Sequence, residues 1–194
     1  MKPALGIILL AAGESRRLGQ AKQLVHIDGI SLVRRAAGVV LALHPHDCLV
    51  ITGAQAAAVT AELKGLPLRC EFNADWKAGM ASSIACGARA LPAKLDGVML
   101  FLCDQWRVDE ADIFKLYRAW CKDAGRIVAS GWDDVTGPPV IFPAGCIECL
   151  RRLEGDQGAR AIIHQQQQQP QRVCMDNARY DLDTPGDLAI LDDF

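Results

Sequence analysis

Apolar positions along the chain follow two periods, one typical of buried strands and one typical of amphipathic helices. Residues 4–11 form a continuous apolar run, the pattern of a strand that is covered on both faces. Ser31 then stands where it can cap a helix that runs through Leu32 to Val40 with apolar residues at helical spacing. The next apolar run, at 48–53, is rich in branched residues and predicts a second strand. The chain therefore begins as strand, helix and strand.

The same alternation continues to residue 130. Helices are predicted at about 54–64, 81–91 and 109–124, and strands at 68–72, 97–104 and 126–130. Because parallel strands need helical crossovers on both faces, the pattern predicts a three-layer α/β/α sandwich with a mostly parallel, Rossmann-like sheet. Ligands of such folds gather at the carboxyl ends of the strands. We therefore expect Gly13, after the first strand, to lie beside Asp104, at the end of the strand 97–104.

After residue 130 the alternation loosens. The sequence "GPP" at 137–139 predicts a stiff turn, followed by a short strand at 140–142 and a helix around 144–153. A further helix is expected to open at "GDQGAR", 155–160, and "DTP" at 183–185 predicts a helix start with proline in its first turn. With 194 residues, the chain has the usual size of one domain with one core.

Composition and charge exclude several kinds of partner. The chain is 51% hydrophobic and 23% charged, with a net charge of −2. This balance gives no overall attraction to nucleic acid or to anionic membranes. No apolar run approaches the ~18 residues of a membrane helix. We therefore expect neither a nucleic-acid partner nor a membrane partner.

The apolar residues near the start of the chain and the cysteines indicate the cellular compartment in which the protein is expected. The start resembles a secretory signal, but cleavage there would remove the first strand of the fold. Cys48, Cys86 and Cys103 lie in apolar segments and resemble small buried hydrophobic residues, which indicates a reducing cytoplasm. Cys146 and Cys149 have C-x-x-C spacing without a second pair, so we expect two positions on one helix face rather than a zinc site.

A cationic loop follows the first predicted strand. Gly13 lets the backbone approach a ligand closely, and Arg16, Arg17 and Lys22 come after it. A Walker A phosphate loop is excluded, because five residues separate Gly13 from Gly19 and glutamine follows the second glycine. The G-x-G-x-x-G pattern of dinucleotide-binding folds is also missing. The loop is therefore either a solvated turn with exposed arginines or an anion-binding loop of another kind.

The stretch from Leu10 to Lys22 matches L-A-A-G-x-S-x-R-x-G-x-x-K at every fixed position. It resembles the signature loop of the nucleotidyltransferases with a Rossmann-like fold, and most of all that of the molybdenum cofactor cytidylyltransferases, relatives of the molybdenum cofactor guanylyltransferases. Later motifs agree in the family's order: "NADWKAGMASSI" at 73–84, "CDQ" at 103–105, "GPPVIFP" at 137–143, "GDQGAR" at 155–160 and "DLDTPGDL" at 181–188. The resemblance implies one nucleotide-diphospho-sugar transferase-like domain, with a nucleotide-binding part at about 1–130 and an acceptor-binding part at about 131–194.

The resemblance implies a CTP-dependent nucleotidyltransferase. It would transfer CMP from CTP to the phosphate of molybdopterin and release pyrophosphate, for the maturation of xanthine- or aldehyde-oxidising molybdoenzymes. Catalysis of this kind is mostly positioning and electrostatic stabilisation. Arg17 matches the position that contacts the β- and γ-phosphates, and Lys22 the position near the α-phosphate and the leaving oxygen.

Magnesium is the implied cofactor, and it usually takes one or two carboxylates together with water and substrate phosphates. Asp104 is the first candidate ligand because it ends the strongest predicted strand. Asp183 matches the family's second acidic position, and Asp181 is a nearby competitor. Asp104 and Asp183 also suit helix caps, which is the alternative interpretation of both.

The nucleotide is expected to contact residues of the first and second motifs, namely Leu10, Ala11, Ala12, Gly13, Ser15, Gly19, Gly79, Ser82 and Ser83. The form "LAAG" resembles the cytidylyl branch, whereas the guanylyl branch has glycine in place of Ala12, whose methyl group would narrow the pocket against a purine. Ser82 and Ser83 stand at a helix start, where hydroxyl and amide groups can read a pyrimidine edge or act as ordinary caps.

The acceptor site is inferred by analogy. Asp156 and Arg160 are expected to border a pocket for the phosphate of molybdopterin. Trp106 replaces the proline that usually follows "CDQ" in the family, and it would stack on a pterin, reshape the pocket or cover apolar surface. Two alternatives remain: transfer to another phosphorylated acceptor, and a non-catalytic protein that delivers finished cofactor to a client molybdoenzyme.

Overall fold

A seven-stranded sheet forms the centre of the computed structural model, which describes residues 2–155, 158–165 and 168–191. Its strands are β1 (Leu5–Ala11), β4 (Asp47–Thr52), β5 (Arg69–Phe72), β6 (Gly97–Leu102), β7 (Val128–Trp132), β8 (Val135–Pro143) and β9 (Gln171–Cys174). They are ordered β5-β4-β1-β6-β8-β7-β9. β2 (His26–Ile27) and β3 (Ile30–Ser31) form a separate hairpin.

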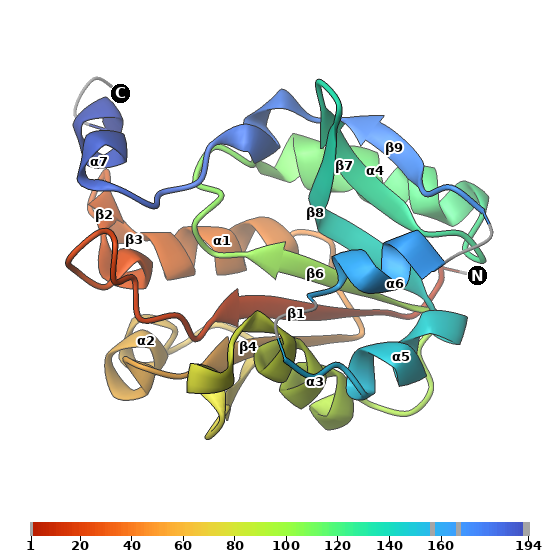
Figure 1. Ribbon diagram of the computed structural model, residues 1–194, viewed down its shortest axis with the longest axis horizontal. Helices are drawn as coiled ribbons and strands as arrows, with labels where there is room; N and C mark the ends of the chain where they lie inside the picture. The colour runs from red at the N-terminus through yellow and green to blue at the C-terminus, as the bar shows by residue number, and fades with distance from the viewer. Residues whose placement is uncertain (1, 156–157, 166–167, 192–194) are drawn as a thin grey trace.

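Helices cover both faces of this sheet (Figure 1). They are α1 (Leu32–Leu41), α2 (Ala56–Glu62), α3 (Met80–Ala90), α4 (Glu110–Lys122), α5 (Ile147–Arg151), α6 (Arg160–Gln165) and α7 (Pro185–Leu191). Four single turns are η1 (Lys22–Leu24), η2 (Trp76–Ala78), η3 (Ala144–Cys146) and η4 (Asp176–Arg179). The result is the predicted three-layer α/β/α sandwich.

The alternation of β1 side chains explains why its sequence is apolar throughout. Ile7 and Leu9 are buried in a cluster with residues of α1, α2 and α4, whereas Ile8 and Leu10 are buried in a second cluster with residues of α3, α5 and α6. β1 pairs in parallel with β4 on one side and with β6 on the other. From β1 the chain continues to β4 and β5 on one side, and it then crosses to β6 on the other side of β1. The loop after β1 therefore lies at the topological switch point, where such sheets bind ligands.

The second half of the sheet departs from the sequence-based expectation. Residues 137–139, predicted as a stiff turn, lie within β8, which runs antiparallel to β6 and β7. The prolines cannot donate to the ladder, and the register shifts beside them, between Ala129 and Ser130. The Ser130 hydroxyl lies within hydrogen-bonding distance of the carbonyl groups of Gly137 and Pro138 and holds this irregular stretch in the sheet. The turn prediction was therefore wrong.

A small apolar cluster joins the two ends of the chain. Leu18, from the cationic loop, and Ile27, from the β2–β3 hairpin, are buried with Leu32 and Leu182, and Leu188 of α7 packs against them. In Figure 1, α7 lies beside this hairpin, away from the centre of the sheet. The cluster thus brings the segment before α7 to the loop after β1.

The cysteine predictions are confirmed in part. Cys48 and Cys103 are buried, but Cys86 is only half-buried. Cys146 is buried in η3 while Cys149 is exposed in α5, so the two do not share one face of a regular helix. All eight cysteines are reduced. In the part of the chain that is described, none of the helices is both long and apolar enough to cross a membrane.

Candidate nucleotide site

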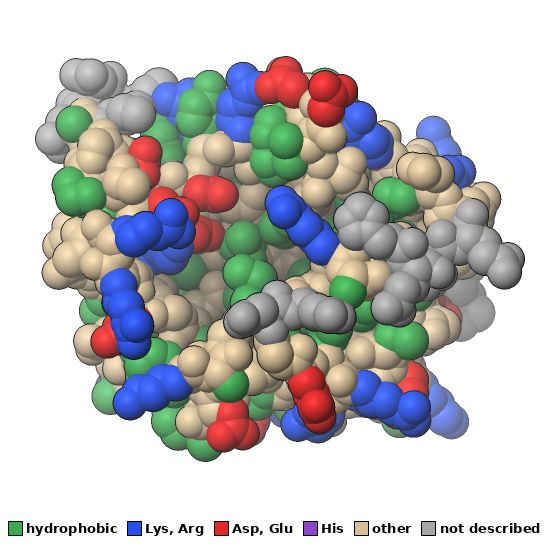
Figure 2. Space-filling view, in the orientation of Figure 1, with side chains coloured by type: hydrophobic (Ala, Val, Ile, Leu, Met, Phe, Trp, Pro, Cys, Tyr) green, Lys and Arg blue, Asp and Glu red, His purple; other side chains and the backbone are tan. Residues whose placement is uncertain are grey.

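A cavity of about 380 Å³ opens at the carboxyl ends of β1 and β6. The loop after β1 forms one wall, η2 and the start of α3 form the opposite wall, and Asp104 lies at the end of β6. Gly13 and Asp104 line the same cavity, as the fold predicted. Figure 2 shows acidic and basic side chains gathered at one side of the hollow in this face. The lining comprises Leu10, Ala11, Ala12, Gly13, Glu14, Ser15, Arg16, Lys22, Gln23, Trp76, Lys77, Gly79, Met80, Ser83, Leu102, Cys103 and Asp104.

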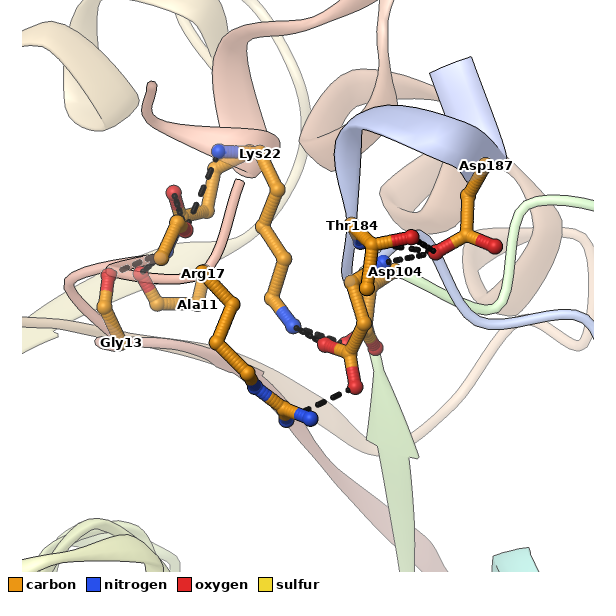
Figure 3. Close-up of polar contacts among 10 residues, drawn as sticks. Ala11, Gly13, Arg17, Lys22, Asp104, Thr184 and Asp187 are labelled. Atoms are coloured by element: carbon orange, nitrogen blue, oxygen red, sulfur yellow. Dashed lines mark hydrogen bonds and ion pairs between the residues drawn. The ribbon is translucent and has the colours of Figure 1, made fainter. Parts of the chain in front are cut away.

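Lys22 bridges Asp104 and Asp183, the two carboxylates that were predicted as metal ligands. Its ammonium group donates to Oδ2 of Asp104 and, at 2.9 Å, to Oδ1 of Asp183. Arg17 donates to the other oxygen of Asp183, also at 2.9 Å. Figure 3 shows both cationic side chains extending from the loop toward this acidic group. Three segments far apart in sequence therefore meet at one charged centre.

The charges at this centre shift two pKa values. Burial by itself lowers the pKa of Lys22, but Asp104 and Asp183 outweigh it and raise that pKa above its ordinary value, so the lysine is cationic at any physiological pH. The pKa of Asp181 is raised to about 7 by partial desolvation of its carboxyl group and by the charges of Asp104 and Asp183. Asp181 is held there by an isolated β-bridge to Gln105.

The acidic pair, Asp104 and Asp183, could hold a divalent metal ion. Asp104 and Asp183 supply hard oxygen donors, and the position of the Lys22 ammonium group shows that positive charge is accommodated between them. Within the described ranges, no three His, Cys, Asp or Glu side chains form a metal-holding group. Two carboxylates are what Mg²⁺ takes when substrate phosphates and water complete its octahedron.

The opposite wall of the cavity is organised by Asn73. This buried side chain donates to the hydroxyl groups of Ser82 and Ser83 at 2.9 and 3.0 Å. The Ser82 hydroxyl lies within hydrogen-bonding distance of the Asp75 and Gly79 carbonyl groups and does not line the cavity. Ser83 does line it, and because its hydroxyl accepts from Asn73, its proton is available for a ligand.

Ala12 and Trp76 both line the cavity, and both lie close to Gly53. A Cβ added at Gly53 would lie 2.5 Å from the Ala12 carbonyl oxygen, 2.8 Å from Cβ of Trp76 and 2.9 Å from Cβ of Ala12. Gly53 therefore permits the close approach of these two residues. Gly79, which also lines the cavity, has a φ of 104°, in the left-handed region that favours glycine.

Several predicted site residues lie away from the cavity lining. Gly19 does not line it; its φ of 76° makes it a turn residue of the loop. Trp106 lines a different cavity, beside α1, and the guanidinium of Arg107 lies over its ring and over that of Tyr180. Arg160 is exposed at the start of α6 and does not line the nucleotide cavity, and Asp156 lies outside the described residues.

Gln23, Asn73 and Trp76 are among the site residues that had no specific prediction. Gln23, Asn73 and Trp76 all face the cavity or hold residues that do. The signal for Gln23 was weak, since it is a single amide next to Lys22, whereas Asn73 begins the motif at 73–84. Trp76 stood inside the second motif and was available to sequence reasoning as an aromatic wall.

The fold and site together define a Rossmann-like α/β protein with a cationic loop facing two carboxylates at the ligand-binding edge of its sheet. A family model described as the MobA-like NTP transferase domain matches residues 7–171. The chain belongs to this family. The resemblance to nucleotidyltransferases that the signature loop predicted is thereby confirmed at the level of the family.

Individual relatives carry diverse names. The chain is 31% identical to nicotine blue oxidoreductase of Paenarthrobacter nicotinovorans, over 84% of this chain and 83% of the relative. It is 26% identical to the purine catabolism protein PucB of Bacillus subtilis (strain 168), over 83% and 81%. Among solved structures, Rv0371c of Mycobacterium tuberculosis H37Rv superposes with a TM-score of 0.82 at 24% identity, covering 98% of this chain and 99% of that one. A structure of Rv0371C complexed with manganese superposes with a TM-score of 0.77 at 22% identity, covering 97% of each chain. These structural similarities support the fold.

Proposed function

We propose that the protein transfers CMP from CTP to the phosphate of molybdopterin and releases pyrophosphate. The observation that carries the proposal is the contact of Lys22 with both Asp104 and Asp183, beside the cavity that the loop after β1 lines. A cation that reaches the substrate phosphates and a carboxylate pair able to hold a divalent ion are the two components that phosphoryl-group chemistry requires. Membership of the MobA-like NTP transferase family supports this chemistry.

The reaction needs little covalent participation from the protein. An oxygen of the acceptor phosphate attacks the α-phosphorus of CTP in line, the bond from that phosphorus to the bridging oxygen of the β-phosphate breaks, and pyrophosphate leaves. Lys22 contacts the α-phosphate and the leaving oxygen as charge accumulates there. Arg17, which is exposed and extends toward the same place, makes forked contacts with the β- and γ-phosphates.

Asp104 and Asp183 would hold Mg²⁺ together with the phosphates. When bound, the ion supplies charge neutralisation on the phosphate oxygens. Lys22 then exchanges its carboxylate partners for phosphate oxygens, a short movement of its flexible side chain. The affinity for Mn²⁺, measured by electron paramagnetic resonance, tests this assignment. Asp104→Asn is expected to weaken Mn²⁺ affinity at least about tenfold, whereas Asp47→Asn, at the amino end of β4, leaves it unchanged.

Cytosine is the proposed base because the signature loop has alanine at position 12. Ala12 stands where the guanylyl branch has glycine, and it lines the cavity together with Trp76. The Ser83 hydroxyl can donate to a pyrimidine edge, and Asn73 fixes its orientation. Ser82 supports the same helix start through its contacts with Asp75 and Gly79.

The acceptor and compartment complete the proposal. Molybdopterin would approach the open side of the cavity from the part of the chain at 131–194, where Arg160 is exposed. The product would serve a molybdenum hydroxylase of the xanthine- or aldehyde-oxidising kind, and the reduced cysteines fit a cytoplasmic site of action. A non-catalytic role in delivering finished cofactor to such a client is the alternative, and it requires no turnover.

The name of the Paenarthrobacter relative suggests redox chemistry instead. The one thiol in the cavity lining, Cys103, is buried, and burial followed by the charge of Asp104 raises its pKa well above its usual range. It therefore does not ionise at neutral pH and is a poor redox-active thiol. The lysine and carboxylate set favours group transfer from a nucleoside triphosphate.

The direct assay incubates the purified protein with Mg²⁺, molybdopterin loaded with molybdenum, and either CTP or GTP. The proposal predicts pyrophosphate release and a CMP-linked product with CTP. Release with GTP but not CTP would overturn the base assignment. Release with another phosphorylated compound but not with molybdopterin would overturn the acceptor. Normal client maturation by Lys22→Ala or Asp104→Ala would favour delivery without catalysis.

A further inference from the structure

Gln23 is a buried amide side chain that has no role in the transfer chemistry described above. It follows Lys22 on η1 and is 1% exposed. Its amide nitrogen donates to the carbonyl oxygens of Ala11, at 3.2 Å, and Gly13, at 2.7 Å. A glutamine amide has two N–H groups, and both are used here on the segment where the chain leaves β1.

The oxygen of the same amide contacts the loop further along. The hydroxyl of Ser15 donates to Oε1 of Gln23 at 3.5 Å and accepts from the backbone N–H of Lys22 at 3.1 Å. Ser15 has a φ of 59°, in the left-handed region that costs free energy for a residue with a side chain. Gln23 and Ser15 together therefore fix the loop and the start of η1 relative to each other.

The hydrogen bonds from Gln23 have an electrostatic consequence for an anion in the cavity. A peptide carbonyl oxygen is partly negative and repels a phosphate, whereas a peptide N–H attracts one. Gln23 engages the carbonyl groups of Ala11 and Gly13, so these two oxygens are held by a donor of the protein. Lys22, the neighbour of Gln23 in the chain, supplies the cation on the same side.

We propose that Gln23 is a positioning residue for the triphosphate of the substrate: it holds the carbonyl groups of the loop away from the phosphates and fixes the origin of the Lys22 side chain. This inference rests on the proposed function, because it takes the phosphates of a nucleoside triphosphate as the ligand of the loop. The base side of the cavity is held by a different amide, that of Asn73. We therefore expect the loss of Gln23 to be specific in its effect, lowering phosphate affinity more than base affinity.

That specificity separates positioning from a merely structural role. Inorganic tripolyphosphate probes the phosphate side of the cavity, and cytidine probes the base side. Gln23→Met keeps the length of the side chain and removes both donors, and Gln23→Asn keeps the donor but is one methylene too short to reach both carbonyl groups. The matched control is Ser130→Ala, which removes a buried hydroxyl group that lies within hydrogen-bonding distance of two carbonyl oxygens of β8, outside the cavity lining.

Binding is measured in Mg²⁺ by calorimetry for tripolyphosphate and CTP, and by ligand-observed NMR for cytidine. Both Gln23 variants are expected to raise the Kd of tripolyphosphate and of CTP at least about tenfold while the Kd of cytidine changes less than about twofold. Ser130→Ala is expected to change none of the three. If Gln23→Met does not fold, the same binding measurements on Gln23→Asn test the inference.

Three results would overturn the inference. An unchanged Kd of tripolyphosphate in a folded Gln23 variant removes the positioning role. An equal loss of affinity for tripolyphosphate and cytidine shows that Gln23 only stabilises the cavity. If the wild-type protein binds neither CTP, GTP nor tripolyphosphate, the proposed function itself fails and the inference fails with it.

Discussion

The ammonium nitrogen of Lys22 lies 2.9 Å from Oδ1 of Asp183, although 161 positions separate the two residues in the chain. The contact exists because Leu182 is buried with Leu18 and Ile27 in a small cluster apart from the main core. Apolar packing of the C-terminal segment therefore sets the position of a carboxylate at the proposed nucleotide site. This arrangement makes α7 and the segment before it part of the functional unit.

Replacing Lys22 should abolish catalysis without unfolding the protein. Lys22→Met removes the cation that stabilises charge on the α-phosphate and the leaving oxygen, and we expect kcat/KM for CTP to fall at least about a hundredfold. Steady-state pyrophosphate release measures the effect. Lys94→Met is the control, since Lys94 is exposed in the loop before β6, at the other end of that strand, and should keep wild-type activity. Equal activity of the two variants would contradict the assigned role.

Arg17 should matter for substrate affinity and little for folding. Its side chain is 75% exposed, and its ion pair with Asp183 is screened by water, so Arg17→Ala should change the free energy of unfolding by less than about 1 kcal/mol. The KM for CTP should rise, because forked contacts to the β- and γ-phosphates are lost. Urea unfolding and steady-state kinetics on the same preparation check both statements. A large loss of stability with an unchanged KM would show that Arg17 is structural.

Asp181 should make stability depend on pH in a defined direction. Its pKa is raised to about 7 in the folded protein from an ordinary value of 3.8, so the folded state binds the proton more tightly than the unfolded chain. Stability contributed by the protonated carboxyl group is fully present below pH 3.8 and is lost as pH rises through 7. Asp181→Asn removes this dependence. In metal-free buffer, the Tm of the variant minus the Tm of the wild type should therefore be more positive at pH 8 than at pH 5. A Tm difference that is the same at both pH values would contradict the assignment.

Gly53 should be intolerant of a methyl group, because the added Cβ would approach the Ala12 carbonyl oxygen to 2.5 Å. Gly53→Ala should destabilise the protein by about 1–3 kcal/mol. Gly38→Ala is the matched control: Gly38 is exposed in α1, no atom lies within 4 Å of an added Cβ, and the change should stabilise by about 0.5–1 kcal/mol. Chemical unfolding of both variants compares them. Equal stabilities would mean that the wall of Ala12 and Trp76 shifts easily.

Sequence patterns were sufficient for the first part of the fold. Buried parallel strands such as β1 and β6 are apolar on both faces, and for β1 this predicted a strand that is covered on both faces. A second rule, that the loops after parallel strands gather at one edge of the sheet, predicted that Gly13 and Asp104 are neighbours, and both line one cavity. β9 and the β2–β3 hairpin were not predicted, because they are short and their sequences are mostly polar. Residues 137–139 were mistaken for a turn, since a strand with two prolines is stable only with the irregular pairing that the neighbouring strand supplies.

The charged part of the site could be predicted from the sequence, but the polar network around it could not. Arg17, Lys22, Asp104 and Asp183 follow strand ends or match a family motif, and the fold brings them together. The roles of Gln23 and Asn73 depend on hydrogen bonds to carbonyl and hydroxyl groups that only the folded backbone positions. Trp106 was considered for the acceptor site, and it lines a separate cavity beside α1.

A crystal structure with Mg²⁺ and a non-hydrolysable CTP analogue tests the central claim most directly. The account predicts the triphosphate in the cavity at the end of β1, with Lys22 Nζ within hydrogen-bonding distance of an α-phosphate oxygen and the metal held by Asp104 and Asp183. A nucleotide bound elsewhere, with Lys22 still paired to both carboxylates, would contradict it.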